Sequence, residues 1–383
     1  MKKRFARRGA ALFAAVIFPL AAANAASPND TARYLAGMKI SEGSSLKALT
    51  GSAAYAAHAL YFERAWAELD ARQLSKVRAW SSENLTAPRP VLFYMFSGPD
   101  FLYANALFPK ADTYVLAGLE PAGDLPDVEA PPRPSLPHEL AALRASLNSV
   151  LSYSFFITKS MKSDLRGHRL NGALPILYVF LARSGKTVES VGFVSLDKNG
   201  ALHSGAAADL ARNAAAGVKI TFLAESNRRQ TLYYFSTDLS NTGTENSGFL
   251  RFCAELGAGD SLLKSASYLP HSNNFSNIRA FLLKHSSTIV QDDTGVPFRY
   301  FDLTGWDLKP FGTYMRPIPK FHGKYQRDLH SFFEKRHARP LQFSFGYRWK
   351  QHSSNILLAI RKPAGPEEAS SLAPPEGRAT EAR

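Results

Sequence analysis

The spacing of apolar residues predicts a helical region over residues 44–80. Alanine and leucine are frequent in this region, and large apolar side chains recur every three or four positions, as they do along the buried face of a helix. The region is therefore expected to present one apolar stripe to the rest of the protein. The residues of the stripe are Tyr55, Leu60, Phe62, Ala65, Trp66 and Leu69.

The next apolar run, residues 91–96, has the length and aromatic content of a buried strand. The segment 97–100 (Ser-Gly-Pro-Asp) interrupts it, and residues 101–108 are expected to form a short helix with Ser97 or Gly98 as its cap and Pro99 in its first turn. A second strand is expected at 113–118. The order strand, helix, strand predicts a parallel strand pair joined by a right-handed crossover.

The rest of the chain mixes helical and strand patterns. The turn at residues 197–200 carries the Asn-Gly signal of a hairpin. The pattern predicts an α/β fold, a layered helix-sheet-helix arrangement with a mixed, mainly parallel sheet and a C-terminal antiparallel hairpin. The expected elements are a helix at 138–159, a strand or buried helix at 175–182, strands at 188–196, 218–224, 231–237 and 288–291, helices at 247–257, 275–285 and 326–337, and a closing antiparallel pair at 343–349 and 355–360.

Changes in composition divide the chain. Six prolines between residues 121 and 137 predict an exposed loop or linker. Whether the regions before and after it make two domains or one continuous sheet stays open. The divisions are a signal peptide at 1–25, an N-terminal helical and β-α-β region at 26–120, the proline-rich segment at 121–137, an α/β region at 138–362 and a disordered tail at 363–383.

The N-terminus has the three parts of a secretory signal peptide. Five cations within residues 2–8 precede an apolar run at 10–23, and Ala23-Asn24-Ala25 supplies the small residues of a cleavage site. The run is shorter than the roughly 20 apolar residues that a spanning helix needs. These features predict a periplasmic or secreted protein with no transmembrane segment in the mature chain.

The charge balance is basic. Removing the five cations of residues 2–8 lowers the formal net charge from +14 to +9. Cations also greatly outnumber acids between residues 309 and 350. Such an excess suits contact with an anionic envelope surface, or it serves only solubility. Export argues against a nucleic-acid partner.

Several chemistries are excluded or lack a motif. Cys253 is the only cysteine, so no internal disulfide and no multi-cysteine zinc site can form, and its place on the predicted 247–257 helix indicates a buried thiol. The chain has no H-E-x-x-H, no G-x-S-x-G and no P-loop. Ser-x-x-Lys occurs three times, once at Ser261 and Lys264, but without the accompanying Lys-Thr-Gly. The sequence therefore predicts no metal site and no cofactor.

The first group of candidate ligand-binding residues is Ser97, Asp100 and Glu120. They follow two consecutive strands, where open α/β sheets bind their ligands. The layout is Rossmann-like, but Pro99 removes a backbone N–H and Asp100 places negative charge where a phosphate would lie. A methyltransferase-like cofactor site, which need not hold phosphates, fits this loop better. The other interpretations are a helix cap and a site for a different ligand.

The second group is Asp238 and Asn241, which follow the strand at 231–237. Asp238 is a candidate general base or an acceptor for sugar hydroxyl groups. The alternative is an ordinary turn that caps the following helix.

The third group, Gln291, Asp292, Asp293 and Arg299, follows the strand at 288–291. Two adjacent carboxylates near an arginine are candidates for binding a cation or for a raised acid pKa. Adjacent strand residues point to opposite faces, so the two acids share one site only if the chain turns there. A solvated turn is the alternative.

Four strings of the sequence are distinctive. They lie at Phe96–Ala104 (FSGPDFLYA), Gly118–Pro121 (GLEP), Phe235–Asn241 (FSTDLSN) and Gln291–Phe301 (QDDTGVPFRYF). These strings resemble those of a family of uncharacterised bacterial exported proteins, and the resemblance runs over roughly residues 85–362. It implies export, and it supplies no activity, cofactor or catalytic residue.

The export signal and the missing catalytic motifs favour a periplasmic α/β protein that binds a ligand or an envelope component. The alternative is an exported hydrolase of envelope glycan or ester, with Asp238, Asp292 or Asp293 as acid or base; such carboxylates can form a glycosidase-like pair. A degenerate nucleotide or methyltransferase-like site is the third reading. Convergence of Ser97, Asp100, Glu120, Asp238 and Asp292 in one cleft, with perturbed carboxylate pKa values, would favour an enzyme, whereas a scatter over solvated turns would exclude it.

Overall fold

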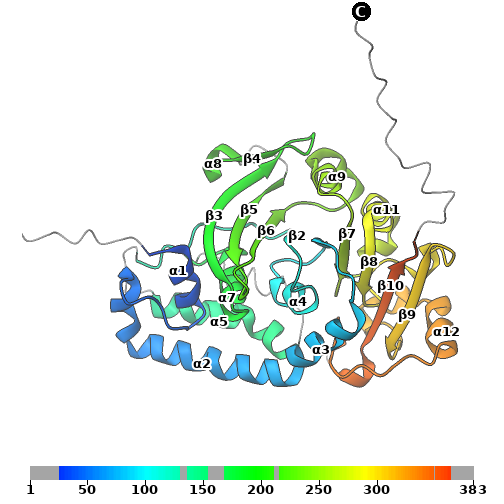
Figure 1. The fold of residues 1–383 in the computed structure, drawn as a ribbon, viewed down its shortest axis with the longest axis horizontal. Coiled ribbons are helices and arrows are strands. Elements are labelled where there is room, and N and C mark those ends of the chain that lie inside the picture. The colour runs from blue at the N-terminus through cyan, green and yellow to red at the C-terminus, as the bar shows by residue number, and fades with distance from the viewer. Residues whose placement is uncertain (1–25, 130–135, 154–167, 211–214, 349, 364–383) are drawn as a thin grey trace, which may run out of the picture.

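The computed structural model describes residues 26–129, 136–153, 168–210, 215–348 and 350–363. In this part of the chain one mixed sheet of ten strands forms the centre, with helices on both faces (Figure 1). The strand order is β4-β3-β5-β6-β2-β1-β7-β8-β10-β9. The strands are β1 (Val91–Tyr94), β2 (Thr113–Gly118), β3 (Thr187–Leu196), β4 (Leu202–Ser204), β5 (Ala215–Leu223), β6 (Arg229–Ser236), β7 (Gly259–Leu263), β8 (Ser286–Gln291), β9 (Trp306–Gly312) and β10 (Asn355–Arg361).

The two faces of the sheet belong to two apolar cores because side chains alternate along each strand. In β1, Leu92 and Tyr94 join one core, while Val91 and Phe93 join the other. The first core is covered by the N-terminal helices and by two later ones. These helices are α1 (Pro28–Leu35), α2 (Ala53–Leu69), α3 (Ser75–Asn84), α4 (Phe101–Leu107), α5 (Leu136–Tyr153) and α7 (Leu174–Arg183), with the short turns η1 (Ser45–Gly51) and η2 (Asp70–Leu74) beside α2.

The predicted helical region at 44–80 is thus observed as η1, α2, η2 and most of α3. Helix α2 begins after Ser52, whose hydroxyl accepts a hydrogen bond from the Tyr55 N–H and so satisfies an otherwise free helix donor. Tyr55, Phe62 and Leu69 recur every seven residues and are buried on one side of the helix. These three residues anchor α2 to the first core, whereas Leu60, which was expected in the apolar stripe, is 45% exposed.

The second core lies under the later helices. Short apolar stripes on three of them, including Phe281 of α11 and Phe333 of α12, pack against the sheet. Cys253 of α10 is fully buried there, and burial raises the pKa of its thiol well above the ordinary value. The helices not yet bounded are α8 (Ala207–Leu210), α9 (Asn241–Ser247), α10 (Phe249–Glu255), α11 (Ser276–His285) and α12 (Arg327–Lys335), with the short turns η4 (Leu269–His271), η5 (Asn273–Phe275), η6 (Phe298–Tyr300), η7 (Pro319–Lys324) and η8 (Gln351–Ser353).

The α/β class and the mixed sheet are confirmed. Strands β6, β2, β1, β7 and β8 run parallel in the middle of the sheet, and β1-α4-β2 is the expected parallel unit. The hairpins β3-β4 and β5-β6 are also present. One sheet contains strands from both sides of the proline-rich segment, including β1 and β2 before it and β3 to β10 after it.

The C-terminal antiparallel pair is confirmed, but its first strand differs from the expected one. Strand β10 pairs with β9, which the sequence pattern did not predict. The segment expected to pair with it, 343–349, has turns and an isolated bridge between Phe345 and Arg348 over its described residues. Its apolar residues Phe343 and Phe345 are buried in the first core without entering the sheet.

Two predictions lie outside the described residues, namely the signal peptide at 1–25 and nearly all of the tail at 363–383. Among the helices that the structure describes, none combines the length and the apolar character needed to cross a membrane.

Asp260 lies near the start of β7, at the edge of the sheet opposite the carboxyl ends of the parallel strands. Its carboxylate is buried and accepts a hydrogen bond from the Arg89 N–H at 2.7 Å. Burial raises the pKa of Asp260 to about 6. In the unfolded chain this group ionises near its ordinary pKa of about 3.9. The stability that Asp260 contributes is therefore fully present below the unfolded pKa and is lost as pH rises through the folded pKa.

Asp260→Asn keeps a carbonyl oxygen for the Arg89 N–H but removes the titration. As pH rises from about 4 to about 7, we expect the free energy of unfolding to fall less in the variant than in the wild type. Urea unfolding at several pH values in this range measures the effect. Asp307→Asn, a change at an exposed carboxylate, is the matched control. An equal dependence of the unfolding free energy on pH in the wild type and in Asp260→Asn would contradict the raised pKa of Asp260.

Candidate functional site at the strand ends

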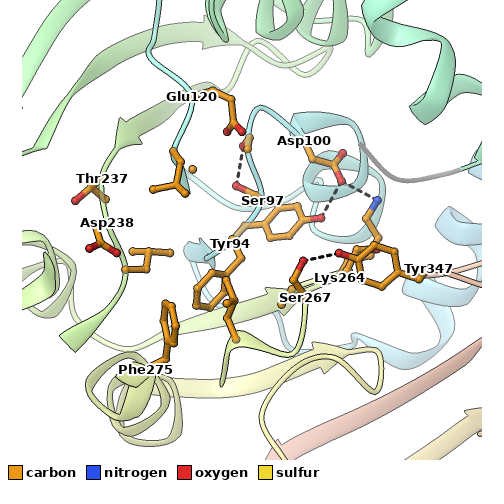
Figure 2. Close-up of a pocket in the computed structure, with 18 residues that line it drawn as sticks. Tyr94, Ser97, Asp100, Glu120, Thr237, Asp238, Lys264, Ser267, Phe275 and Tyr347 are labelled. Atoms are coloured by element: carbon orange, nitrogen blue, oxygen red, sulfur yellow. Dashed lines mark hydrogen bonds and ion pairs between the residues drawn. The ribbon is translucent and has the colours of Figure 1, made fainter. Parts of the chain in front are cut away.

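The order of the parallel strands creates a crevice beside β1. From β1 the chain moves to β2 and later β6 on one side, and to β7 and β8 on the other. Loops at the carboxyl ends of β1 and β7 therefore diverge, which is where doubly wound sheets bind ligands. A cavity of about 320 Å³ lies there, lined by residues at or just beyond the ends of β1, β2, β6 and β7 (Figure 2). We call it the strand-end pocket.

Asp100 shapes the side of this pocket that follows β1. It is the N-cap of α4, and its Oδ1 accepts a hydrogen bond from the Tyr103 N–H at 3.1 Å. Its Oδ2 accepts one from the Tyr94 hydroxyl at 2.8 Å. The expected cap, Ser97 or Gly98, is thus wrong, because the helix begins at Phe101. The protein's own carboxylate thus occupies the N-terminal end of this helix, where an anion such as phosphate would otherwise be favoured.

Lys264 follows β7 and completes this corner. Its ammonium group lies 2.8 Å from Asp100 Oδ2 and 3.5 Å from the centre of the Tyr103 ring. Both side chains of the ion pair are almost fully buried. Burial lowers the pKa of Lys264, and the charge of Asp100 opposes that shift. The pair joins β7 to the start of α4 across the pocket, as Figure 2 shows.

Glu120 follows β2 and is 8% exposed. Its backbone oxygen accepts a hydrogen bond from the Tyr234 hydroxyl at 2.8 Å. Among the described residues, nothing forms a hydrogen bond or ion pair with its carboxylate. A Cβ at position 118 would lie 2.7 Å from Glu120 Oε2 and 2.9 Å from Gly98 Cα. Because residue 118 is glycine, the Glu120 carboxylate and the Gly98 backbone can both lie close to it. The pocket therefore holds a buried carboxylate whose acceptor positions are open.

Two hydroxyl groups in the pocket wall are also unused. Thr237 Oγ1 and Ser265 Oγ are buried, and neither has a hydrogen-bond partner among the described residues. Thr237 directly follows β6 and is 4% exposed. A buried hydroxyl without a partner costs about 1–3 kcal/mol. A ligand with polar groups would remove this cost.

The segment after β7 is held in an uncommon backbone conformation. Ser265, Ser267 and Tyr268 have φ values of 57°, 52° and 54°. Residues other than glycine rarely adopt such angles, and each costs about 1–3 kcal/mol unless the surroundings impose it. The Ser267 and Tyr347 hydroxyl groups form a hydrogen bond of 2.6 Å, which ties this segment to the chain around Tyr347. This wall of the pocket is therefore formed before any ligand arrives.

The loop after β8 also stabilises the segment that follows β7, through hydrogen bonds to Ser265 and Ala266. Asp292 Oδ2 accepts a hydrogen bond from the Ser265 N–H at 3.0 Å, and its Oδ1 accepts from both the N–H and the hydroxyl of Thr294. The Thr294 hydroxyl in turn accepts from the Ala266 N–H at 2.7 Å. Asp292 is buried but does not line the pocket. It positions the pocket wall.

Asp293 does not line the strand-end pocket. Its carboxylate accepts hydrogen bonds from the Tyr268 hydroxyl and, at 3.0 Å, from the side-chain amide of Asn355. Burial raises the pKa values of Asp292 and Asp293, and the charge of Asp293 adds to the shift at Asp292. The two acids do not share one site, since the chain does not bring both carboxylates to the pocket.

The structure brings together four of the sequence candidates, Ser97, Asp100, Glu120 and Asp238, which all line the pocket. Asp238 is exposed at its rim, and its carboxylate accepts hydrogen bonds from the N–H and hydroxyl of Ser240 at 2.8 and 2.7 Å. The Ser97 hydroxyl donates to the Gly98 oxygen at 2.8 Å.

Three other candidates lie away from the strand-end pocket. Asn241 ties α9 to α11 through the Ser276 hydroxyl at 2.9 Å, and the Gln291 amide bonds both backbone groups of Val296 at 2.8 Å. Arg299 is exposed in the turn η6.

The sequence candidates did not include Lys264, Ser265, Phe275 or Tyr347, although these residues line the pocket. The sole signal at Lys264 was a Ser-x-x-Lys string, which has no catalytic geometry here because the Ser261 hydroxyl bonds Ser286 at 2.7 Å instead. Recognising β7 as a strand would have placed Lys264 and Ser265 at its carboxyl end.

The chain was compared with protein-family models, curated proteins and solved structures, and nothing matched in any of the three. Within the described residues, no three His, Cys, Asp or Glu side chains gather closely enough to hold a metal ion.

Proposed function

We propose that the protein is exported to the cell envelope and binds there a small, phosphate-free ligand with neighbouring hydroxyl groups, in the strand-end pocket. The observation that carries the proposal is the open, buried carboxylate of Glu120, with the unused hydroxyl groups of Thr237 and Ser265 in the same pocket. A carboxylate can accept hydrogen bonds from two adjacent hydroxyl groups at once. Asp100 disfavours phosphate.

The apolar part of the pocket suits the remainder of such a ligand. The rings of Phe96 and Phe275 lie 5.8 Å apart, edge to face, and both line the pocket together with Leu239 and Leu269. Polar groups at one side and aromatic rings at the other are typical of sites for sugars and nucleosides. Binding is favoured over hydrolysis because the carboxylates of Asp238 and Asp292 are occupied by hydrogen bonds within the protein.

A methyltransferase-like cofactor site is a second candidate, favoured by the strand order. The parallel strands β6-β2-β1-β7-β8 follow the doubly wound order 3-2-1-4-5. Beyond them β10 runs in the opposite direction and lies between β8 and β9. S-adenosylmethionine has a ribose diol, no phosphate and a positive charge, which the open carboxylate of Glu120 would complement.

Glu120→Gln tests both candidates. Adenosine, S-adenosylmethionine and a simple hexose are titrated into the protein by calorimetry, with adenosine monophosphate as the phosphorylated counterpart. We expect a diol-bearing probe to bind the wild type, and Glu120→Gln to weaken it about 10- to 100-fold, because a charge-assisted hydrogen bond is lost. The phosphorylated probe is expected to bind less well than adenosine.

Glu255→Gln removes the same charge from an exposed position on α10 and is the control. Preference for S-adenosylmethionine over adenosine selects the methyltransferase-like candidate. Unchanged affinity in Glu120→Gln, tighter binding of the monophosphate, or no binding of any diol-bearing probe would each count against the proposal.

A further inference from the structure

We propose that a second cavity binds small ligands in which a carboxylate adjoins a neutral amide N–H, as at the end of a peptide or in an N-acylated amino acid. This cavity of about 680 Å³ is lined by residues of α2, α3, α4 and α7 and of the turns before β2, β3 and β6. It therefore lies at the opposite ends of these strands from the strand-end pocket. We call it the Lys186 pocket. The proposal does not depend on Glu120 or on the proposed function.

Lys186 supplies the charge that selects an anion. It lines the cavity and is 7% exposed, and its ammonium group forms no hydrogen bond and no close ion pair within the described part of the chain. The negative end of α7, which ends at Arg183, helps to hold a cation there but leaves the three N–H donors of the ammonium group unused. A buried charge without a partner is costly, and a ligand carboxylate would remove this cost.

Most other charged groups in the wall of the Lys186 pocket have partners in the protein. Arg78 forms an ion pair with Asp70 at 2.7 Å. The Arg183 Nε donates a hydrogen bond to the Ala36 backbone oxygen at 2.9 Å. These groups are thus satisfied without a ligand, whereas Lys186 is not.

Glu225 is the remaining charged residue of the wall. It is exposed, and a Cβ at position 185 would lie 2.6 Å from its Oε1, so its carboxylate lies against the turn before Lys186. Burial lowers the pKa of Lys186, and the charge of Glu225 opposes this shift without forming an ion pair. The described residues that line the cavity include three cations and two acids, a balance that favours a ligand with one negative charge.

Asn105 of α4 supplies a second unused group. Its Oδ1 is buried and has no hydrogen-bond partner among the described residues, and the side chain lines the same cavity. A buried acceptor needs a donor, so the ligand must bring an N–H or O–H group. A neutral amide N–H suits the cavity better than an ammonium group, because the wall already has an excess of cations.

The rest of the wall suits an apolar side chain of the ligand. Trp66 and Met38 are half-buried there, and Leu74 and Leu102 are almost fully buried. An aromatic ring of the ligand would pack favourably against the Trp66 ring. N-acetyl-phenylalanine combines a carboxylate, a neutral amide N–H and an aromatic ring, so it is the probe of choice.

The test is a calorimetric titration of the whole protein near neutral pH with three probes. N-acetyl-phenylalanine is compared with its carboxamide, which lacks the negative charge, and with 3-phenylpropionate, which keeps the charge and the ring but lacks the amide N–H. We expect the first to bind at least about tenfold more tightly than either of the others, because each lacks one buried hydrogen bond. Equal affinity for the three probes would overturn the proposal.

Variants assign the two preferences to residues. Lys186→Met is expected to weaken N-acetyl-phenylalanine about tenfold or more and to abolish its advantage over the carboxamide. Asn105→Leu is expected to abolish its advantage over 3-phenylpropionate. Lys110→Met removes an exposed cation that follows the pocket residue Pro109 but does not line the cavity, and it should leave binding unchanged. Equal weakening by Lys110→Met would show nonspecific attraction and overturn the proposal.

Thermal unfolding without ligand separates a binding role of Lys186 from a structural one. Because Lys186→Met removes a buried charge that has no partner, we expect its unfolding temperature to equal or exceed that of the wild type. A clear fall would mean that the ammonium group stabilises the fold itself, and it would overturn the proposal.

Acetyl-Gly-Gly-Phe distinguishes the two sources of the ligand chemistry. Tighter binding of this peptide than of N-acetyl-phenylalanine would support the end of a peptide chain as the ligand. Equal or weaker binding, still above that of 3-phenylpropionate, would support a free N-acylated amino acid. Binding of the peptide that Lys186→Met does not weaken would overturn the proposal for both sources.

Discussion

Lys264→Met is expected to destabilise the folded protein by about 3–5 kcal/mol. The change leaves Asp100 without its cation in a fully buried position, and an uncompensated buried charge costs that much. Asp100→Asn is expected to have a similar effect, because it leaves the ammonium group of Lys264 buried against a neutral partner. Denaturant unfolding of the two variants measures both losses.

The double variant Asp100→Asn/Lys264→Met decides whether the ion pair is the cause. Removing both charges should cost clearly less than the two single losses added together, since no lone charge remains. The exposed pair of Lys47 and Glu42, at 3.0 Å, is the control, and Lys47→Met should cost at most about 1 kcal/mol. Strict additivity of the two changes at 100 and 264 would refute a coupled buried pair.

The second large effect is expected at Asp292. Asp292→Ala removes the acceptor of three hydrogen bonds, from the Ser265 N–H and from two donors of Thr294, and should cost about 3 kcal/mol or more. Asp238→Ala, at an exposed turn, should stay within about 1 kcal/mol. Urea unfolding of the two variants separates a positioning acid from an exposed one.

The stability difference between the wild type and Asp292→Ala is expected to depend on pH with a definite sign. Because burial raises the pKa of Asp292, its stabilising contribution is present below the unfolded pKa and is lost as pH rises through the folded pKa. The stability gap between the wild type and Asp292→Ala should therefore be widest in acid and narrow towards alkaline pH. A gap that widens with pH would mean that the ionised carboxylate is the stabilising form.

Most of the longer helices and most strands of this protein could be predicted from local patterns, whereas α1 and α9 were not among the expected elements. The stripe along α2 and the alternating hairpins β3-β4 and β5-β6 follow from the periods of helix and strand. The candidates Ser97, Asp100 and Glu120 could be found because side chains at the ends of consecutive parallel strands meet at one edge. Their convergence in the strand-end pocket follows from the β1-α4-β2 unit.

Strand β7 could not be predicted, because its sequence is not apolar enough. Asp260 and Ser261 are buried within it, and both are tolerated through partners distant in sequence. Asp260 accepts from the Arg89 N–H, and the Ser261 hydroxyl bonds that of Ser286 at 2.7 Å. Such partners are unknown before the fold is known, so the sequence analysis predicted no strand at 259–263. Lys264 was missed for the same reason.

The sequence alone therefore predicted many of the helices and strands, with β7 and β9 among the exceptions, and it predicted that polar residues would gather where β1 and β2 end. Only the tertiary structure decided which acids are open to a ligand. Asp100, Glu120 and Asp292 are buried carboxylates that follow β1, β2 and β8. Asp100 is paired with Lys264, Asp292 accepts hydrogen bonds from the Ser265 N–H and from Thr294, and Glu120 alone of the three has no hydrogen-bond or ion-pair partner among the described residues. Lys264 and Ser265 come from a segment distant in sequence from these acids, so local patterns do not reveal them.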